Sequence, residues 1–370
     1  MRTAREPRGR SRAPLTGSPR ALHPGAWWVW ALALAVAASR TTNPLLLGLV
    51  IAVAGFVVAH RRTDAPWALA FRLYAYIGAV IVASRVLFRI LIGGEDGGHV
   101  LFTLPTIPLP AAAAGITLLG PTSAEELLGG FYDGLRLAAI VICVGAANAL
   151  ANPKRLLKAV PGALYEVGTA VTVALSVAPQ LVESVQRVRR ARRLRAGRSR
   201  GFRVVKGIFV PVLADAMDRS LLLAAAMDSR GYGRRGYLAP RVRALIAVCV
   251  LAGMIGVAVG VYGVLDGTST WLGLPMLAAG LVVAGAGFVL GGRRVRRTAY
   301  RPDLWRLPET LVVLCGVGAC ALLFAAGPAG LYPTGLEWPS LPVLPVLSVL
   351  IGALPAWLAP RPVPLLEVAR

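Results

Sequence analysis

Two short arginine-centred segments are the strongest candidates for a functional site in this sequence. They read Leu194-Arg195-Ala196-Gly197 and Ser229-Arg230-Gly231. Each arginine follows an amphipathic pattern with helical spacing and precedes a glycine, Gly197 or Gly231, at which a helix is expected to end. A planar guanidinium on a rigid helix end can anchor in a groove of a partner protein. It can also stabilise the helix dipole or bind anionic lipid headgroups, and the spacing alone does not separate these three interpretations.

Two long amphipathic helices must position these arginines. The first is expected over about 164–195, where Pro179 is the one strong helix breaker. The second is expected over about 211–230, where Asp215 and Arg219 form a favourable i,i+4 pair. The sequence therefore predicts that both arginines lie at the C-terminal ends of helices.

Residues that would carry catalysis or hold a cofactor are missing from the sequence. No G-x-x-x-x-G-K-[ST] motif occurs, so the chain is not expected to bind ATP through a P-loop. The 4 cysteines lie inside apolar blocks and the 3 histidines are far apart, which gives no metal-ligand spacing. We therefore expect no catalytic residue, no cofactor and no metal site. A membrane enzyme acting on lipids remains an alternative, with Asp215 and Asp218 as its nearest candidates.

The composition is that of a membrane protein. Hydrophobic residues make up 56% and charged residues 15% of the 370 residues, and an average soluble domain has roughly 25% charged residues. Most of the apolar blocks approach the length of about 20 residues that crosses a bilayer. The blocks are 27–39, 44–59, 67–92, 131–150, 243–265, 271–290, 307–326 and 341–358. The predicted fold class is an all-α integral membrane protein with about eight transmembrane helices and a cytoplasmic insert of long amphipathic helices.

Two weaker apolar segments, 100–119 and 164–179, are not expected to cross the membrane. The first contains Pro105, Pro108 and Pro110, which prevent a continuous helix. We therefore expect it to be a re-entrant or surface segment on the outer side. The tryptophans lie at or near the ends of the strong blocks, where their rings are expected at the membrane interface.

The net charge of +23 is distributed in a way that predicts topology. Basic and charge-poor loops alternate along the chain, as the positive-inside rule requires. The arginine-rich segments 61–62, 187–206 and 293–301 are therefore expected in the cytoplasm, together with both termini of this multi-pass plasma-membrane protein. A membrane-anchored protein whose basic insert binds anionic lipid or nucleic acid is a further alternative, although 187–201 contains no aromatic residue that could stack on bases.

Four segments resemble the transmembrane (T) component of energy-coupling factor transporters, the family that includes the cobalt-transport permease. The matching segments are Thr42-Asn43-Pro44-Leu45-Leu46, Asn152-Pro153-Lys154-Arg155-Leu156-Leu157, Leu175 to Glu183 with the arginines that follow, and Ala226-Met227-Asp228-Ser229-Arg230-Gly231-Tyr232-Gly233. The last is similar to the family signature "E-A-x-x-x-R-G-[FY]-G". The resemblance covers about residues 20–265.

The resemblance implies a function and a set of partners. In that family, small membrane-embedded S components capture the substrate, two cytoplasmic ATPases supply energy, and the T component joins them. The resemblance implies that the motifs of this chain that insert into the ATPase grooves are Leu194-Arg195-Ala196 and Ser229-Arg230-Gly231. The first departs from the common pattern, because Ala196 separates Arg195 from the glycine. The S component selects the substrate, so vitamins and transition-metal ions both remain open.

These expectations divide the chain into five parts. They are a basic cytoplasmic tail (1–26), N-terminal membrane helices (27–151), a cytoplasmic coupling-helix region (152–240), a C-terminal membrane hairpin (241–300) and an additional membrane hairpin (301–370).

Overall fold

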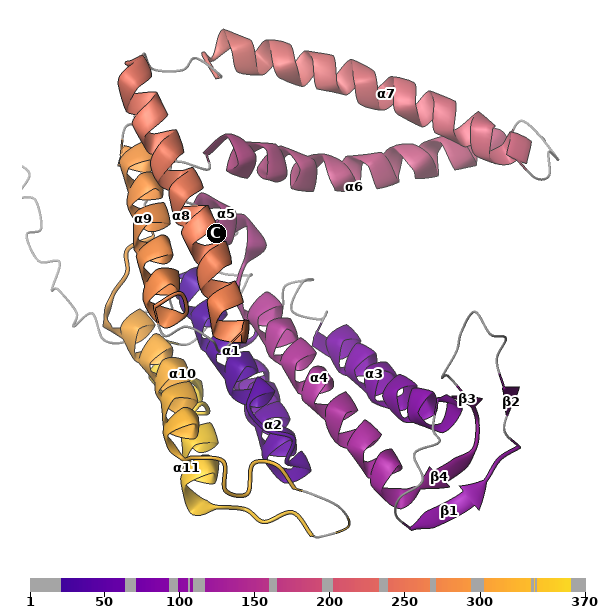
Figure 1. Ribbon diagram of the computed structural model, residues 1–370. Helices are drawn as coiled ribbons and strands as arrows, with labels where there is room; N and C mark the ends of the chain where they lie inside the picture. Colours follow the sequence, from indigo (N-terminus) through magenta and orange to yellow (C-terminus); the bar gives the residue numbers. More distant parts are fainter. Residues whose placement is uncertain are drawn as a thin grey trace, which may run out of the picture. The chain divides into compact units, whose positions relative to one another are not determined.

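A computed structural model describes residues 21–63, 71–92, 99–105, 107–108, 117–159, 165–194, 202–232, 239–266, 271–293, 303–333, 336 and 338–360 (Figure 1). Its contacts divide the chain into two compact units. One consists of Met1–Leu156 with Asp303–Arg370, and the other of Leu157–Pro302. The last part of the chain thus folds together with the first.

In the residues that the structure describes, the first unit is a helical bundle with four short strands. Its helices are α1 (Pro24–Ser39), α2 (Pro44–Arg61), α3 (Phe71–Leu91), α4 (Ala124–Leu150), α10 (Leu307–Ala325), α11 (Val343–Ile351) and α12 (Pro355–Leu358), and α5 (Pro153–Lys158) straddles the boundary of the unit. Strand β1 (Val100–Thr103) pairs antiparallel with β4 (Pro121–Ser123), and β2 (Ile107–Pro108) with β3 (Thr117–Leu118). The second unit contains α6 (Tyr165–Leu194), α7 (Phe202–Ser229), α8 (Pro240–Asp266) and α9 (Leu274–Arg293).

The structure confirms the prediction of an all-α membrane protein. Seven helices in the described part of the chain are long and apolar enough to cross a bilayer, namely α2, α3, α4, α6, α8, α9 and α10. The segment 100–119, which was expected to lack a continuous helix, contains only short strands among its described residues.

The set of long apolar helices differs from the expected one in three places. The block 27–39 forms α1, whose 16 residues are shorter than the length that crosses a bilayer. Helix α6 qualifies by length and composition, because the part of its 30 residues before the basic end is largely apolar and carries few charges. The block 341–358 was expected to be one span, but it forms α11 and α12 instead. The break falls between Gly352 and Pro355, since proline has no backbone N–H to donate to the carbonyl one turn earlier.

Trp27 and Trp30 of α1 lie in the core of the first unit. Both side chains are buried, and the exposed fraction of Trp30 is 0%. The Trp30 indole donates a hydrogen bond of 3.0 Å to the carbonyl oxygen of Gly352. A side chain at Gly316 would clash with the Trp30 backbone, so glycine lets α10 approach α1 closely. These two tryptophans therefore pack between helices, and their expected position at the membrane interface stays a prediction.

The turn between α1 and α2 is tied to the chain before α11. Asn43 is fully buried and caps α2, since its Oδ1 accepts hydrogen bonds from the backbone N–H groups of Leu45 and Leu46. Its Nδ2 donates to the carbonyl oxygens of Gly330 at 2.8 Å and Ser340 at 2.7 Å. At the other end of α2, Arg61 donates two hydrogen bonds to the carbonyl of Ala356. The segment after residue 303 is therefore an integral part of this bundle.

The second unit contains a tightly packed helix pair, α8 and α9. Side chains at Gly253, Gly260 and Gly280 would clash with backbone atoms of the facing helix. Small residues that allow such close backbone approach are typical of helix pairs in membranes. The pair corresponds to the membrane hairpin that was predicted over 241–300.

Candidate functional site

Helix α7 ends in a well-defined cap at the second arginine segment. The backbone N–H of Gly231 donates to the carbonyl of Asp228 at 2.9 Å, and that of Tyr232 donates to the carbonyl of Met227 at 3.0 Å. Together these bonds form a Schellman motif, which needs a left-handed residue. Gly231 supplies it with φ of +75°. Arg230 is thus held at the end of α7 by backbone geometry, and its side chain is exposed.

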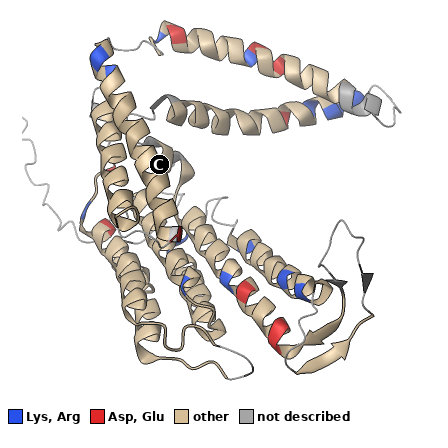
Figure 2. Cartoon of the chain, in the orientation of Figure 1, with Lys and Arg blue, Asp and Glu red and all other residues tan. Residues whose placement is uncertain are grey.

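The first arginine segment begins at the end of α6. Leu194 is the last residue of the helix, and 87% of its surface is exposed. Arg195, Ala196 and Gly197 lie outside the described residues. Lys and Arg gather towards this end of α6, whereas Asp and Glu are few (Figure 2).

Helices α6 and α7 run antiparallel and contact each other in a regular register (Figure 1). Gln180 of α6 contacts Arg219 of α7, and Ser184 contacts Asp215. A step of four residues along α6 therefore matches a step of four residues in the opposite direction along α7. Because the helices are antiparallel, the end of α6 lies near the start of α7, and Arg230 lies at the far end of the pair.

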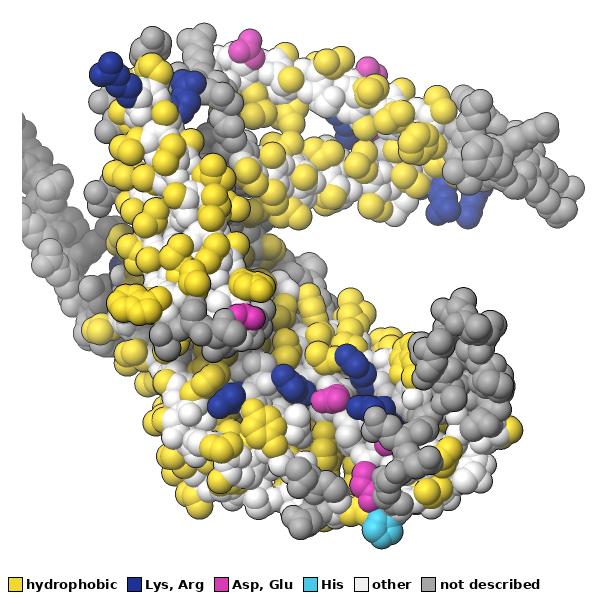
Figure 3. Space-filling view, in the orientation of Figure 1, with side chains coloured by type: hydrophobic (Ala, Val, Ile, Leu, Met, Phe, Trp, Pro, Cys, Tyr) yellow, Lys and Arg dark blue, Asp and Glu magenta, His cyan; other side chains and the backbone are white. Residues whose placement is uncertain are grey.

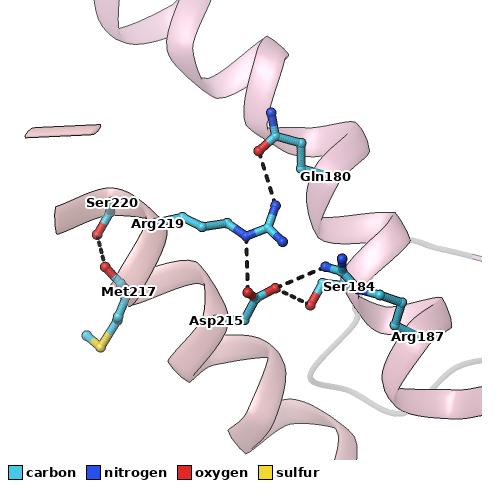
Figure 4. A network of polar contacts seen from close by, with 7 residues as sticks. All are labelled: Gln180, Ser184, Arg187, Asp215, Met217, Arg219 and Ser220. Carbon is cyan, nitrogen blue, oxygen red and sulfur yellow. Dashed lines mark hydrogen bonds and ion pairs between the residues drawn. The ribbon is translucent and has the colours of Figure 1, made fainter. Parts of the chain in front are cut away.

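A polar cluster joins the two helices, and Figure 4 shows it from close by. It consists of Gln180, Ser184, Arg187, Asp215 and Arg219, and we call it the Asp215 cluster. The Ser184 hydroxyl donates to Asp215 Oδ2 at 2.6 Å. Arg219 Nε lies 3.1 Å from Asp215 Oδ1, and Arg187 Nη2 lies 3.4 Å from Oδ2. The predicted i,i+4 pair of Asp215 and Arg219 is therefore confirmed.

The environment of Asp215 favours its charged form. The hydrogen bond from Ser184 lowers the pKa of the Asp215 carboxyl below its ordinary value, and the hydrogen bond and charge of Arg219 lower it further. The carboxylate is therefore ionised at neutral pH. A group held in this form by arginine partners is poorly suited to act as a general base. The alternative of a lipid enzyme built on Asp215 and Asp218 finds no support in this geometry, because no histidine lies in α6 or α7.

The surface of this hairpin is unusually apolar. Large hydrophobic side chains are exposed along α7, namely those of Phe209, Val210, Met217, Leu221 and Leu222. Figure 3 shows hydrophobic side chains over much of α6 and α7. Exposed apolar surface of this extent marks a region that contacts a membrane or another protein.

The comparison with protein families decides what kind of chain this is. The family model described as cobalt transport protein (CbiQ) matches residues 17–238. The chain belongs to the CbiQ cobalt transport protein family. A search of curated proteins found no match.

The CbiQ match covers α1 to α7 and ends just before α8. Both arginine segments and the Asp215 cluster therefore lie inside the part that this chain shares with its family. Taken with the apolar helices, membership in CbiQ makes this chain a membrane component of a cobalt or energy-coupling transporter. Helices α8 to α12 lie outside the match, although α10 to α12 complete the bundle of α1 and α2.

Sequence reasoning missed most of the Asp215 cluster. Only the pair of Asp215 and Arg219 was predicted, whereas α6 contacts this pair through Gln180 and Ser184. The available signal was the spacing of these two residues, which places them on one helix face together with Arg187. Nothing in the sequence alone shows that this face meets Asp215.

Proposed function

We propose that this chain is the transmembrane scaffold subunit of an ATP-driven importer of the energy-coupling factor type. It couples two cytoplasmic ABC-type ATPases to a membrane-embedded S component that captures the substrate. The substrate is a transition-metal ion or a vitamin, and the cobalt transport family favours the metal ion. The observation that carries this proposal is Arg230, which a Schellman motif fixes at the exposed end of a long helix.

The arrangement of the hairpin supports a separate ATPase for each arginine segment. Helix α7 has 28 residues, which corresponds to a length of about 42 Å. Since α6 ends near the start of α7, the two segments belong to opposite ends of a rigid element of this length. A separation of this size favours two grooves on two subunits over two sites on one small domain. The exposed apolar side chains of α7 then face the bilayer or the S component.

Purification of the chain from its native membranes tests this proposal. We expect two ATPase chains and a small membrane protein to remain bound through detergent extraction. Two ATPase chains for each copy of this chain, one for each arginine segment, would support the assignment of the two segments as ATPase-binding sites. A preparation that contains the chain alone, without any ATPase, would contradict it.

Labelling of single cysteines tests the proposed topology. The native cysteines are replaced by alanine, and one cysteine is introduced at Arg294 or at Thr268. A membrane-impermeant maleimide should label Thr268→Cys in intact cells and leave Arg294→Cys unlabelled until the membrane is opened, because arginine-rich loops stay in the cytoplasm. Labelling of Arg294→Cys from outside would show that the proposed orientation is wrong.

A further inference from the structure

The contact between α6 and α7 contains few buried side chains. Within the parts of these helices whose side chains the structure describes, 167–194 and 207–229, Ser184 is the one buried residue, with 3% of its surface exposed. Its partner across the contact is Asp215, which also pairs with Arg187 of α6 and Arg219 of α7. Among these described side chains, no fully buried apolar cluster fixes the angle between the two helices.

The Asp215 carboxylate is the centre of this contact. It accepts a hydrogen bond from Ser184 and pairs with Arg187, both on α6, while Arg219 pairs with it from α7. Arg219 also donates from Nη1 to Oε1 of Gln180 on α6. Charge-assisted hydrogen bonds are directional, so they fix the rotation and register of a helix more closely than apolar contacts do.

We propose that Asp215 is a positioning residue that sets the opening between α6 and α7 and thereby the placement of Arg230. This inference rests on the proposed function, because it assigns Asp215 the task of keeping the two ATPase-binding ends in a fixed relation. The helices lie close together near Leu194 and diverge towards Ser229 (Figure 1). Asp215 lies between these two ends and fixes how far the helices open. A displacement imposed on one arginine end is then transmitted to the other instead of being absorbed by a change of angle.

The first test measures the opening directly in the full chain, reconstituted in nanodiscs. Spin labels are placed at the exposed positions Leu175 of α6 and Leu222 of α7, in a variant with the native cysteines replaced by alanine. The distance distribution should be narrow in this background and should broaden in Asp215→Ala and in Ser184→Ala. Asp218→Ala is the matched control, because Asp218 lies on the same helix with an exposed side chain. Alanine has the higher helix propensity, so none of these changes weakens α6 or α7 as a helix.

The second test measures coupling in the assembled complex. Asp215→Ala should retain both ATPases to within about twofold, because the arginine ends are unchanged. Substrate imported per ATP hydrolysed should fall by about tenfold, as expected for the loss of hydrogen bonds to a charged group. Ser184→Thr, which keeps the hydroxyl, should recover most of the coupling that Ser184→Ala loses.

The outcomes separate the positioning role of Asp215 from the proposed function. A distribution that stays narrow in Asp215→Ala, or one that broadens equally in Asp218→Ala, overturns the inference. Coupling that is unchanged in Asp215→Ala does the same. If the unaltered chain binds no ATPase, the proposed transport role fails, while the distance measurement still decides whether Asp215 sets the opening.

Discussion

The double variant Arg195→Ala, Arg230→Ala should insert and fold normally but lose both ATPases and stop transport. Arg230 is exposed and caps α7 through its backbone, so replacing its side chain leaves the Schellman motif intact. Truncation of an arginine at the centre of an interface can cost about 2 kcal/mol or more in binding free energy. An arginine that contacts only water or lipid should cost about 1 kcal/mol or less. Retention of the ATPases on the purified chain and uptake in proteoliposomes measure the two effects.

The control for this variant removes equal charge next to the proposed contact. Arg198→Ala, Arg200→Ala should retain the ATPases, since these arginines lie beyond the segment assigned to the groove. Lysine at positions 195 and 230 should restore assembly only in part, because a point charge does not reproduce the planar fork of a guanidinium. If the control variant disrupts assembly as strongly as the double variant, general electrostatic attraction explains the arginines better than groove binding does.

Asn43→Ala should strongly destabilise the first unit. The substitution removes the cap of α2 and the two hydrogen bonds that the buried Asn43 amide donates to the carbonyls of Gly330 and Ser340. A lost cap costs about 1 kcal/mol and each lost hydrogen bond about 1 kcal/mol, so we expect a loss of about 3 kcal/mol. The measurement is the temperature at which the detergent-solubilised chain loses its monodisperse gel-filtration peak.

Asn148→Ala is the matched control for this second prediction. Asn148 lies on α4 and donates one hydrogen bond of 2.8 Å to the Tyr74 hydroxyl. Its removal should cost about 1 kcal/mol, since membrane helices gain little from a single side-chain hydrogen bond. Equal losses in the two variants would mean that the tie to the C-terminal segment adds nothing to the stability of the bundle.

The sequence predicted the elements whose determinants are local. The long helix up to Leu194, the pair of Asp215 and Arg219, and most of the apolar helices depend on periodicity and on spacing within one helix. The class of the fold follows from composition and block length. These features can be predicted without knowing which helices contact each other.

The features that the sequence did not predict depend on contacts between distant segments. Trp30 matches an interface residue by its position in the chain, but it is buried because α10 and Gly352 surround it. Ser184 looks like a neutral polar residue in an amphipathic helix, and only its partner on α7 gives it a role. Such partners lie tens to hundreds of residues away in sequence, beyond the reach of any periodic pattern.

The hydrogen bonds between the first two helices and the C-terminal segment determine when this protein can fold during synthesis. The hydrogen bonds of Asn43 bridge 287 and 297 residues of chain, and that of Trp30 bridges 322. At roughly 5–20 residues per second, a ribosome needs about 15–60 s to supply the partners of Asn43. Throughout that interval the first two helices are in the membrane with the Asn43 amide unsatisfied by protein. Water, lipid headgroups or an insertion factor must supply hydrogen-bond partners for this amide during the interval. The bundle closes only after the final apolar segments have left the translocation machinery.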